Sequence, residues 1–174
     1  MEPLNSIPAI LRRISMAVSI LIMLVSTVWL LILWPKIPDT VPVSFAADGT
    51  PNGYDGRLTL LAPLIVGWIV VALFIFLEFF PQFWNIPGKG NGFRVSVGKF
   101  GAANNGAQAT PGAIASMRNM MAVDRIMAAL LFSVISISSA KCRDLPVGAM
   151  ISIFAIMFVA SVFFSIQASR RNSR

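Results

Sequence analysis

The stretch ISMAVSILIMLVSTVWLLILW, residues 14–34, decides the fold class of this chain. It runs for 21 residues without a charged side chain, and twelve of them are Ile, Leu or Val. At 1.5 Å per residue, a helix of this length spans about 30 Å, the thickness of the hydrocarbon core of a bilayer. Arg12 and Arg13 precede the run as in a signal peptide. However, the run is longer than the apolar region of a signal peptide, and no small-residue cleavage site follows it. The sequence therefore predicts a retained membrane-spanning helix.

The composition agrees with a membrane protein. Apolar residues make up 56% of the 174 residues and charged residues only 12%, whereas a soluble domain carries about 25% charged residues. There is no histidine and only one cysteine. This removes the commonest general base and excludes a disulfide within the chain or a cysteine-based zinc site. The sequence shows no nucleophile–base pair, phosphate-binding loop or metal cluster, so we expect no enzyme activity, no metal and no cofactor.

Three further apolar segments complete an all-α, polytopic membrane fold. We expect residues 1–174 to form a single membrane domain, with a structured outer loop that contains a short strand and turns. The four predicted transmembrane helices cover residues 14–34, 58–80, 119–140 and 145–166, joined by an outer loop at 35–57 and an inner loop at 81–118.

The third span gives the weakest signal. Its uncharged part, residues 126–140, has 15 residues, fewer than the roughly 20 that a spanning helix needs. Extension back to residue 119 includes Asp124 and Arg125. We expect these two residues to form a pair at the headgroup level where the helix enters the membrane, with the Arg125 side chain reaching out to water.

Glu78 is the one acidic residue inside the second predicted span. Acidic residues near the middle of a membrane suggest ion pathways. Glu78 lies two residues from the end of its span, so an interfacial ion pair with Arg118 or Arg125 is favoured instead.

The basic residues predict the orientation in the membrane. With four spans, ten Lys and Arg residues fall on one side and four on the other. Basic residues concentrate on the cytoplasmic side, so we expect a multi-pass protein of the cell membrane with both termini in the cytoplasm. The inner set is Arg12, Arg13, Lys89, Arg94, Lys99, Arg118, Arg125, Arg170, Arg171 and Arg174, and the outer set is Lys36, Arg57, Lys141 and Arg143.

The excess charge also suggests partners. Four aspartates balance the basic residues of the outer side, so the net charge of +7 lies on the inner side. Anionic lipid of the inner leaflet is the expected partner. Nucleic acid is not expected, because no basic stripe is interleaved with aromatic residues. The inner loop is rich in Gly, Ala and Asn, but a short strand or surface-lying segment is indicated by the alternating residues Phe93, Val95 and Val97.

The outer polar segment, WPKIPDTVPVSFAADGTPNGYDGR at residues 34–57, is the most specific part of the chain. Pro38 and Pro42 each fix their own φ angle and favour an extended residue before them. A short edge strand over the mouth of the bundle is predicted by the alternating residues Val41, Val43 and Phe45.

Two turn dipeptides, Asp48-Gly49 and Asn52-Gly53, make this loop compact and stiff. Two interpretations stay open. The loop is a cap that covers the outer ends of the first two helices, or it is a recognition surface, because rigid exposed loops often carry binding residues.

The spacing Asp48-x-Thr50-x-Asn52-Gly53 also matches the first half of a calcium-binding loop. The twelfth position of such a loop needs a bidentate Glu, but Thr59 stands there. A simple turn is therefore favoured over calcium binding.

Eleven residues of the outer loop follow a recognisable order: Ile37, Pro38, Asp39, Val41, Pro42, Phe45, Gly49, Pro51, Asn52, Gly53 and Tyr54. This order resembles the N-terminal domain of SdpI-like membrane proteins, a family named after the immunity protein for a sporulation-delay toxin. The resemblance covers roughly residues 20–75. Ser44 stands where that family usually has His, and Arg57 where it usually has Lys. Arg57 keeps the positive charge, whereas Ser44 lacks the titratable ring.

The resemblance implies a non-enzymatic role in toxin immunity or in signalling through the membrane, with a peptide or protein partner at the outer loop. The residues it points to as candidate recognition residues are Pro38, Asp39, Pro42, Ser44, Phe45, Asn52, Gly53, Tyr54 and Arg57.

An accessory subunit of a larger membrane complex, or an oligomer, is the alternative. Small residues spaced four apart let helix backbones approach closely. They occur at Gly148 and Ser152 and at Ser161 and Ser165 of the last span, and polar notches occur in the third span at Ser133, Ser136, Ser138 and Ser139. Packing within the bundle is the default interpretation, and docking against another subunit is the more specific functional hypothesis. The thiol of Cys142, in the short outer connection, is expected to be inert.

Overall fold

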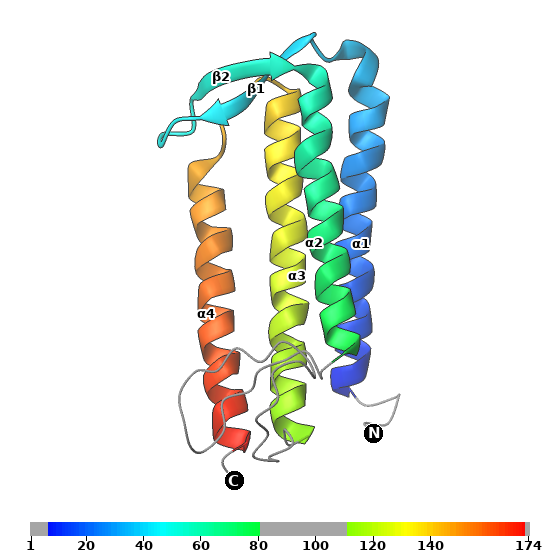
Figure 1. Ribbon diagram of the computed structural model, residues 1–174, viewed down its shortest axis with the longest axis vertical. Coiled ribbons are helices and arrows are strands. Elements are labelled where there is room, and N and C mark those ends of the chain that lie inside the picture. The colour runs from blue at the N-terminus through cyan, green and yellow to red at the C-terminus, as the bar shows by residue number, and fades with distance from the viewer. Residues whose placement is uncertain (1–6, 81–110, 173–174) are drawn as a thin grey trace, which may run out of the picture.

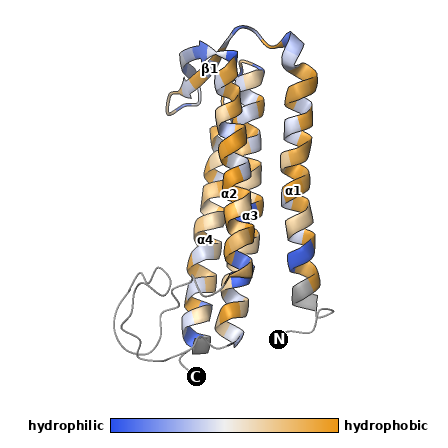
Figure 2. Ribbon diagram, turned by 45° about the vertical axis from the view of Figure 1, so that its right-hand side comes forward, coloured by the Kyte–Doolittle hydropathy of each residue, from blue (hydrophilic) through white to orange (hydrophobic). Residues whose placement is uncertain are grey.

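The computed structural model describes residues 7–80 and 111–172, which form the four long helices that the sequence predicts (Figure 1). The helices are α1 (Ile7–Leu33), α2 (Leu61–Phe79), α3 (Pro111–Ala140) and α4 (Val147–Asn172). Each is long and apolar enough to cross a membrane. Most of their length is orange in Figure 2, the colour of hydrophobic residues, and a hydrophilic turn lies near the start of α1. The expected fold class, a multi-pass membrane protein of four helices with a small sheet in a loop, is confirmed.

The third helix differs most from the sequence-based expectation. The weakest predicted span is part of the longest described helix, 30 residues that begin at Pro111. Residues 111–118, assigned to the inner loop, are therefore helical. Proline is favoured in the first turn of a helix, and packing against neighbours stabilises the small-residue turns that follow. The remaining inner-loop residues, 81–110, include the alternating segment at 93–97 and lie outside the described residues.

α3 is the centre of the bundle. It packs against α1, α2 and α4, whereas α4 packs chiefly against α3. Small residues make this possible, since the buried face of α3 is largely Ala and Ser. Gly67 of α2 shows how close the helices come: a Cβ atom there would lie 2.7 Å from Met23 Cε of α1 and 2.8 Å from Phe132 Cβ of α3.

The serines of α3 are polar contacts inside the bundle. Ser133, Ser136, Ser138 and Ser139 are all buried. Ser26 of α1 donates a hydrogen bond to Ser133 over 2.7 Å between the hydroxyl oxygens, and Ser133 donates to the Ala129 carbonyl oxygen at 2.7 Å. The small residues at the start of α4 behave differently. A Cβ atom on Gly148 would meet nothing within 4 Å, and Ser152 is exposed.

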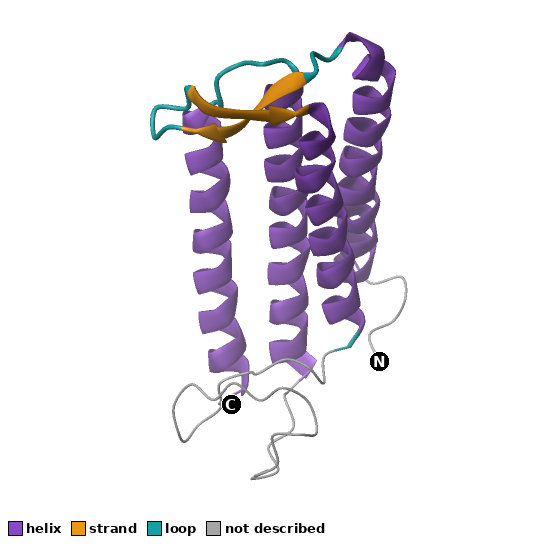
Figure 3. Cartoon of the chain, turned by 45° about the horizontal axis from the view of Figure 1, so that its top comes forward, coloured by secondary structure: helices purple, strands orange, loops and turns teal. Residues whose placement is uncertain are grey.

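The outer loop is a β-hairpin rather than a single strand. β1 (Thr40–Phe45) pairs antiparallel with β2 (Pro51–Gly56), and short 3-10 turns, η1 (Trp34–Lys36) and η2 (Arg57–Leu60), join the hairpin to α1 and α2. The hairpin lies across the ends of the helices, opposite the end at which α1 begins and α4 ends (Figures 1 and 3). We call these two ends of the bundle the hairpin end and the terminal end.

The alternation predicted for the first strand is wrong. Val41 and Pro42 are both buried, and Val43 is 44% exposed. Register shifts between Pro42 and Ser44 and between Ser44 and Phe45 interrupt the pairing with β2. A bulge of this kind breaks the period of two, so the side chains before and after it no longer share one face.

Candidate functional site

The tip of the hairpin is a tight, internally bonded turn. The Asp48 carboxylate accepts hydrogen bonds from the Thr50 amide at 2.9 Å and the Thr50 hydroxyl at 2.6 Å. These bonds hold the pKa of Asp48 below its usual value, and the bond from the Thr50 hydroxyl has the larger effect. The stabilisation that these bonds give the turn is therefore fully present above the usual pKa of aspartate. It is lost as the pH falls through the lowered pKa of Asp48. Gly49 completes the turn with φ of +90°, a conformation that glycine adopts without strain.

The turn is docked on the connection between α3 and α4. The Leu145 amide donates a hydrogen bond to the Gly49 carbonyl oxygen at 2.9 Å. A Cβ atom on Gly49 would overlap the Leu145 carbonyl oxygen and would lie 2.8 Å from Val147 Cγ2. Only glycine therefore fits both the backbone conformation and the space.

The base of the hairpin is fixed as well. The Arg57 amide donates to the Asp39 carbonyl oxygen at 2.9 Å, and the two side chains form an exposed ion pair at 3.8 Å. The Arg57 guanidinium also lies 5.7 Å from the centre of the Trp34 ring, within cation–π range. Since both ends of the hairpin are bonded, its backbone is fixed on the bundle.

The candidate recognition residues divide by exposure. Pro42 is buried and supports the hairpin from below. Phe45, Gly53 and Arg57 are half-buried, and those on the surface are Pro38, Asp39, Ser44, Asn52 and Tyr54. The Ser44 hydroxyl donates to Asn52 Oδ1 at 2.6 Å, so Ser44 cross-links the two strands. Sequence reasoning missed two further exposed apolar residues, Val43 at 44% and Leu58 at 69% exposure, in addition to Tyr54 at 63%.

The half calcium motif occupies this same turn. Its first residue, Asp48, is engaged by Thr50, and Thr59 donates its hydroxyl hydrogen to the Gly56 carbonyl oxygen. Within the described residues, no group of three or more His, Cys, Asp or Glu side chains lies close enough to hold a metal ion.

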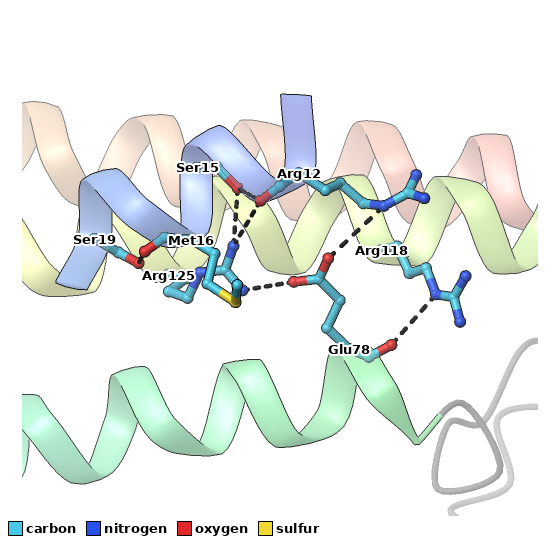
Figure 4. A network of polar contacts seen from close by, with 7 residues as sticks. All are labelled: Arg12, Ser15, Met16, Ser19, Glu78, Arg118 and Arg125. Atoms are coloured by element: carbon cyan, nitrogen blue, oxygen red, sulfur yellow. Dashed lines mark hydrogen bonds and ion pairs between the residues drawn. The ribbon is translucent and has the colours of Figure 1, made fainter. Parts of the chain in front are cut away.

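A second polar site lies near the terminal end of the bundle, around Glu78 (Figure 4). Arg125 Nη1 is 2.5 Å from Glu78 Oε2, and Arg12 Nε is 3.7 Å from Glu78 Oε1. Arg125 Nη2 also donates to Ser15 Oγ at 2.8 Å. The cluster therefore joins α1, α2 and α3 through a single carboxylate.

The two arginines expected near Glu78 have different partners. Arg125 meets the carboxylate, whereas Arg118 donates from Nε to the Glu78 backbone carbonyl oxygen at 3.3 Å. Arg12 and Ser15 were missed. The order of the spans could have predicted them: α1 and α2 run in opposite directions, so residues at the start of α1 lie beside the end of α2, where Glu78 is.

The expectation that Arg125 reaches out to water is wrong. Arg125 is fully buried, because α1 and α2 close over it. The carboxylate of Glu78 and the hydroxyl of Ser15 bind the two terminal nitrogens of the guanidinium, whereas its Nε is buried without a hydrogen-bond partner among the described residues. Asp124 and Arg125 do not pair with each other, because their side chains point to different helices. Asp124 faces α4, where the Ser161 hydroxyl donates to its Oδ2 at 3.1 Å.

Comparison with known proteins finds a family match in the first half of the chain. Residues 21–67 match a family described as a domain of unknown function, DUF1648. This range runs from α1 through the whole hairpin into α2. An uncharacterized protein from Archaeoglobus fulgidus is 32% identical over 85 residues, which cover 43% of this chain and 44% of the relative. The chain thus matches less than half the length of that relative. No solved structure matches this chain. The description of the DUF1648 family names no activity.

Proposed function

We propose that this membrane protein is a non-enzymatic recognition protein of SdpI-like type, acting in toxin immunity or membrane signalling. In this proposal both termini lie in the cytoplasm, where the excess of basic residues meets anionic lipid. The hairpin then lies on the outer surface of the cell membrane, where it binds a membrane-active peptide.

The observation that carries the proposal is the fixed hairpin with exposed apolar side chains. The hairpin is bonded at its base and at its tip, yet Val43, Tyr54 and Leu58 remain exposed. A rigid surface loses little conformational entropy on binding, and aromatic residues such as tyrosine dominate recognition surfaces. An amphipathic peptide at the membrane surface offers the complementary apolar groups.

The test compares the growth of cells with and without the chain in a panel of membrane-active peptides. We expect at least one peptide to inhibit the deletion strain more strongly and the intact chain to restore resistance. Tyr54→Ser should weaken binding of that peptide about tenfold, or about 1.4 kcal/mol, and should reduce protection accordingly. Asp55→Asn on the same strand is the matched control, because it keeps the oxygen that accepts from the Gly56 amide. Equal sensitivity of both strains to every peptide would contradict the proposal.

A second candidate function is that of an accessory subunit in a larger membrane complex. The specific observation is that Gly148 and Ser152 of α4 are exposed and do not take part in packing within the bundle. Small residues on an open helix face suit close approach by another helix. Purification in a gentle detergent should then recover a stoichiometric partner that Gly148→Leu releases, and a chain that purifies alone would rule this function out.

A further inference from the structure

One buried carboxyl group takes no part in the hairpin or in the Glu78 cluster. Asp124 is 5% exposed and lies in the seam between α3 and α4. Its Oδ2 accepts the hydrogen bond from Ser161, whereas its Oδ1 is buried and has no partner among the described residues. A carboxylate oxygen that is enclosed without a donor or a cation is costly. An ionisable residue in a spanning helix is therefore a signal for function.

No charged group in the described residues pairs with Asp124. Arg125, the next residue in the chain, directs its guanidinium to the other side of α3, toward Glu78 and Ser15. Among the other charged helix residues whose side chains the structure describes, none forms an ion pair with Asp124, and these are Arg12, Arg13, Glu78, Arg118 and Arg170.

Polar contacts continue along the same seam toward the terminal end. Ser165 Oγ on α4 lies 3.8 Å from Met120 Sδ, and Ser116 Oγ lies 2.9 Å from Gln167 Oε1. Residues 116, 120 and 124 are four apart, so they share one face of α3. Together they cover about 12 Å along the helix axis. The seam thus offers polar partners between the terminal end and the carboxyl group.

We propose that Asp124 is a proton-binding site that exchanges protons with water through the α3–α4 seam. The proton is transferred from hydronium to Oδ1 and leaves a water molecule behind, and release is the reverse step. A proton fits the site better than a metal ion, because Ser161 is the one side chain in the described residues that bonds to the carboxyl group. The neutral acid fits the enclosed seam, whereas the ionised form lacks a counter-charge. Proton binding is therefore linked to the packing of α4 on α3.

Infrared spectroscopy of the full chain in phosphatidylcholine nanodiscs tests this assignment. The carbonyl band of a protonated carboxyl group is followed between about pH 5 and 9, where exposed aspartates are ionised. We expect one such band at neutral pH. It should shift when the aspartate side chains carry 13C at the carboxyl position, disappear in Asp124→Asn and persist in Asp144→Asn. Ser161→Ala should change its frequency, because the hydrogen bond to Oδ2 is lost.

The labelled wild-type chain decides the question even if Asp124→Asn fails to fold. The other four aspartates, Asp39, Asp48, Asp55 and Asp144, are exposed, so an aspartate band above pH 5 has no other source. Absence of the band over the whole range would overturn the proposal. Loss of the band when Na⁺ or K⁺ is added at constant pH would also overturn it, because the site would then hold a metal ion.

Discussion

At the scale of single residues, Arg125 is the fully buried charged side chain among the described residues and needs the most electrostatic compensation. Its side chain is fully buried, and the carboxylate it meets belongs to Glu78, whose side chain is 13% exposed. Taking both ions out of water is costly, and their mutual attraction offsets this cost only with good geometry. The separation of 2.5 Å and the added hydrogen bond to Ser15 supply part of this geometry, whereas Arg125 Nε is buried without a partner among the described residues. We infer that the pair sets how α1, α2 and α3 fit together, more than it adds net stability.

Glu78→Gln should destabilise the bundle strongly. The substitution keeps the size of the side chain but leaves the guanidinium of Arg125 buried without an opposite charge. Loss of one partner of a buried pair costs about 3–5 kcal/mol. The expected result is a clear fall in the midpoint of thermal unfolding, followed by circular dichroism in detergent micelles.

The double variant Glu78→Leu with Arg125→Met is the matched control. Both variants remove the carboxylate that also faces Arg12, and the double variant in addition removes the buried guanidinium of Arg125, so it should be more stable than Glu78→Leu alone. If the single and double variants unfold together, the ion pair has no structural role.

At the scale of elements, the hairpin is positioned by contacts that lie outside its own strands. Its tip accepts a hydrogen bond from Leu145, which lies about a hundred positions later in the chain at the connection of α3 and α4. A two-stranded hairpin alone is marginal in water. Docking on the bundle therefore stabilises the hairpin and sets where its exposed residues lie.

Gly49→Ala should release the hairpin tip. A residue with a Cβ atom at positive φ costs roughly 1–2 kcal/mol, and the Cβ atom would also collide with the carbonyl oxygen of Leu145. We expect the Leu145 amide to exchange its hydrogen faster, as measured by hydrogen–deuterium exchange. Gly56→Ala is the control, because φ at Gly56 is −61° and no atom lies within 4 Å of the added Cβ. Equal exchange in the two variants would show that the tip is not docked.

The elements also show what the sequence could predict. The long apolar runs predicted four helices, because a run of about 20 apolar residues has few other stable environments. The turn dipeptides and prolines predicted a structured outer loop. The bulge in β1 was not predictable from alternation, because it depends on pairing with β2. The burial of Arg125 was missed because charge alone does not show which helix faces will close over a side chain.

At the scale of the whole molecule, one helix organises the bundle. α3 contacts the three other helices, and its two ionisable neighbours point in different directions, Arg125 toward α1 and α2 and Asp124 toward α4. The part of the chain that matches DUF1648, residues 21–67, includes neither of them. The hairpin and the α3 sites are therefore separable in sequence, although they belong to one bundle.

The orientation of the molecule can be tested with its own cysteine. Cys142 is the single cysteine of the chain, and it is exposed at the hairpin end. The excess of basic residues at the terminal end predicts that this end lies in the cytoplasm. A thiol reagent that cannot cross the membrane should therefore label Cys142 in intact cells. For the control, Arg170→Cys is combined with Cys142→Ser, which moves the thiol to an exposed position at the terminal end. This variant should react only after the cells are permeabilised. The opposite pattern, with Cys142 protected until permeabilisation and the control labelled in intact cells, would place the hairpin in the cytoplasm and would also remove it as a receptor for an external peptide.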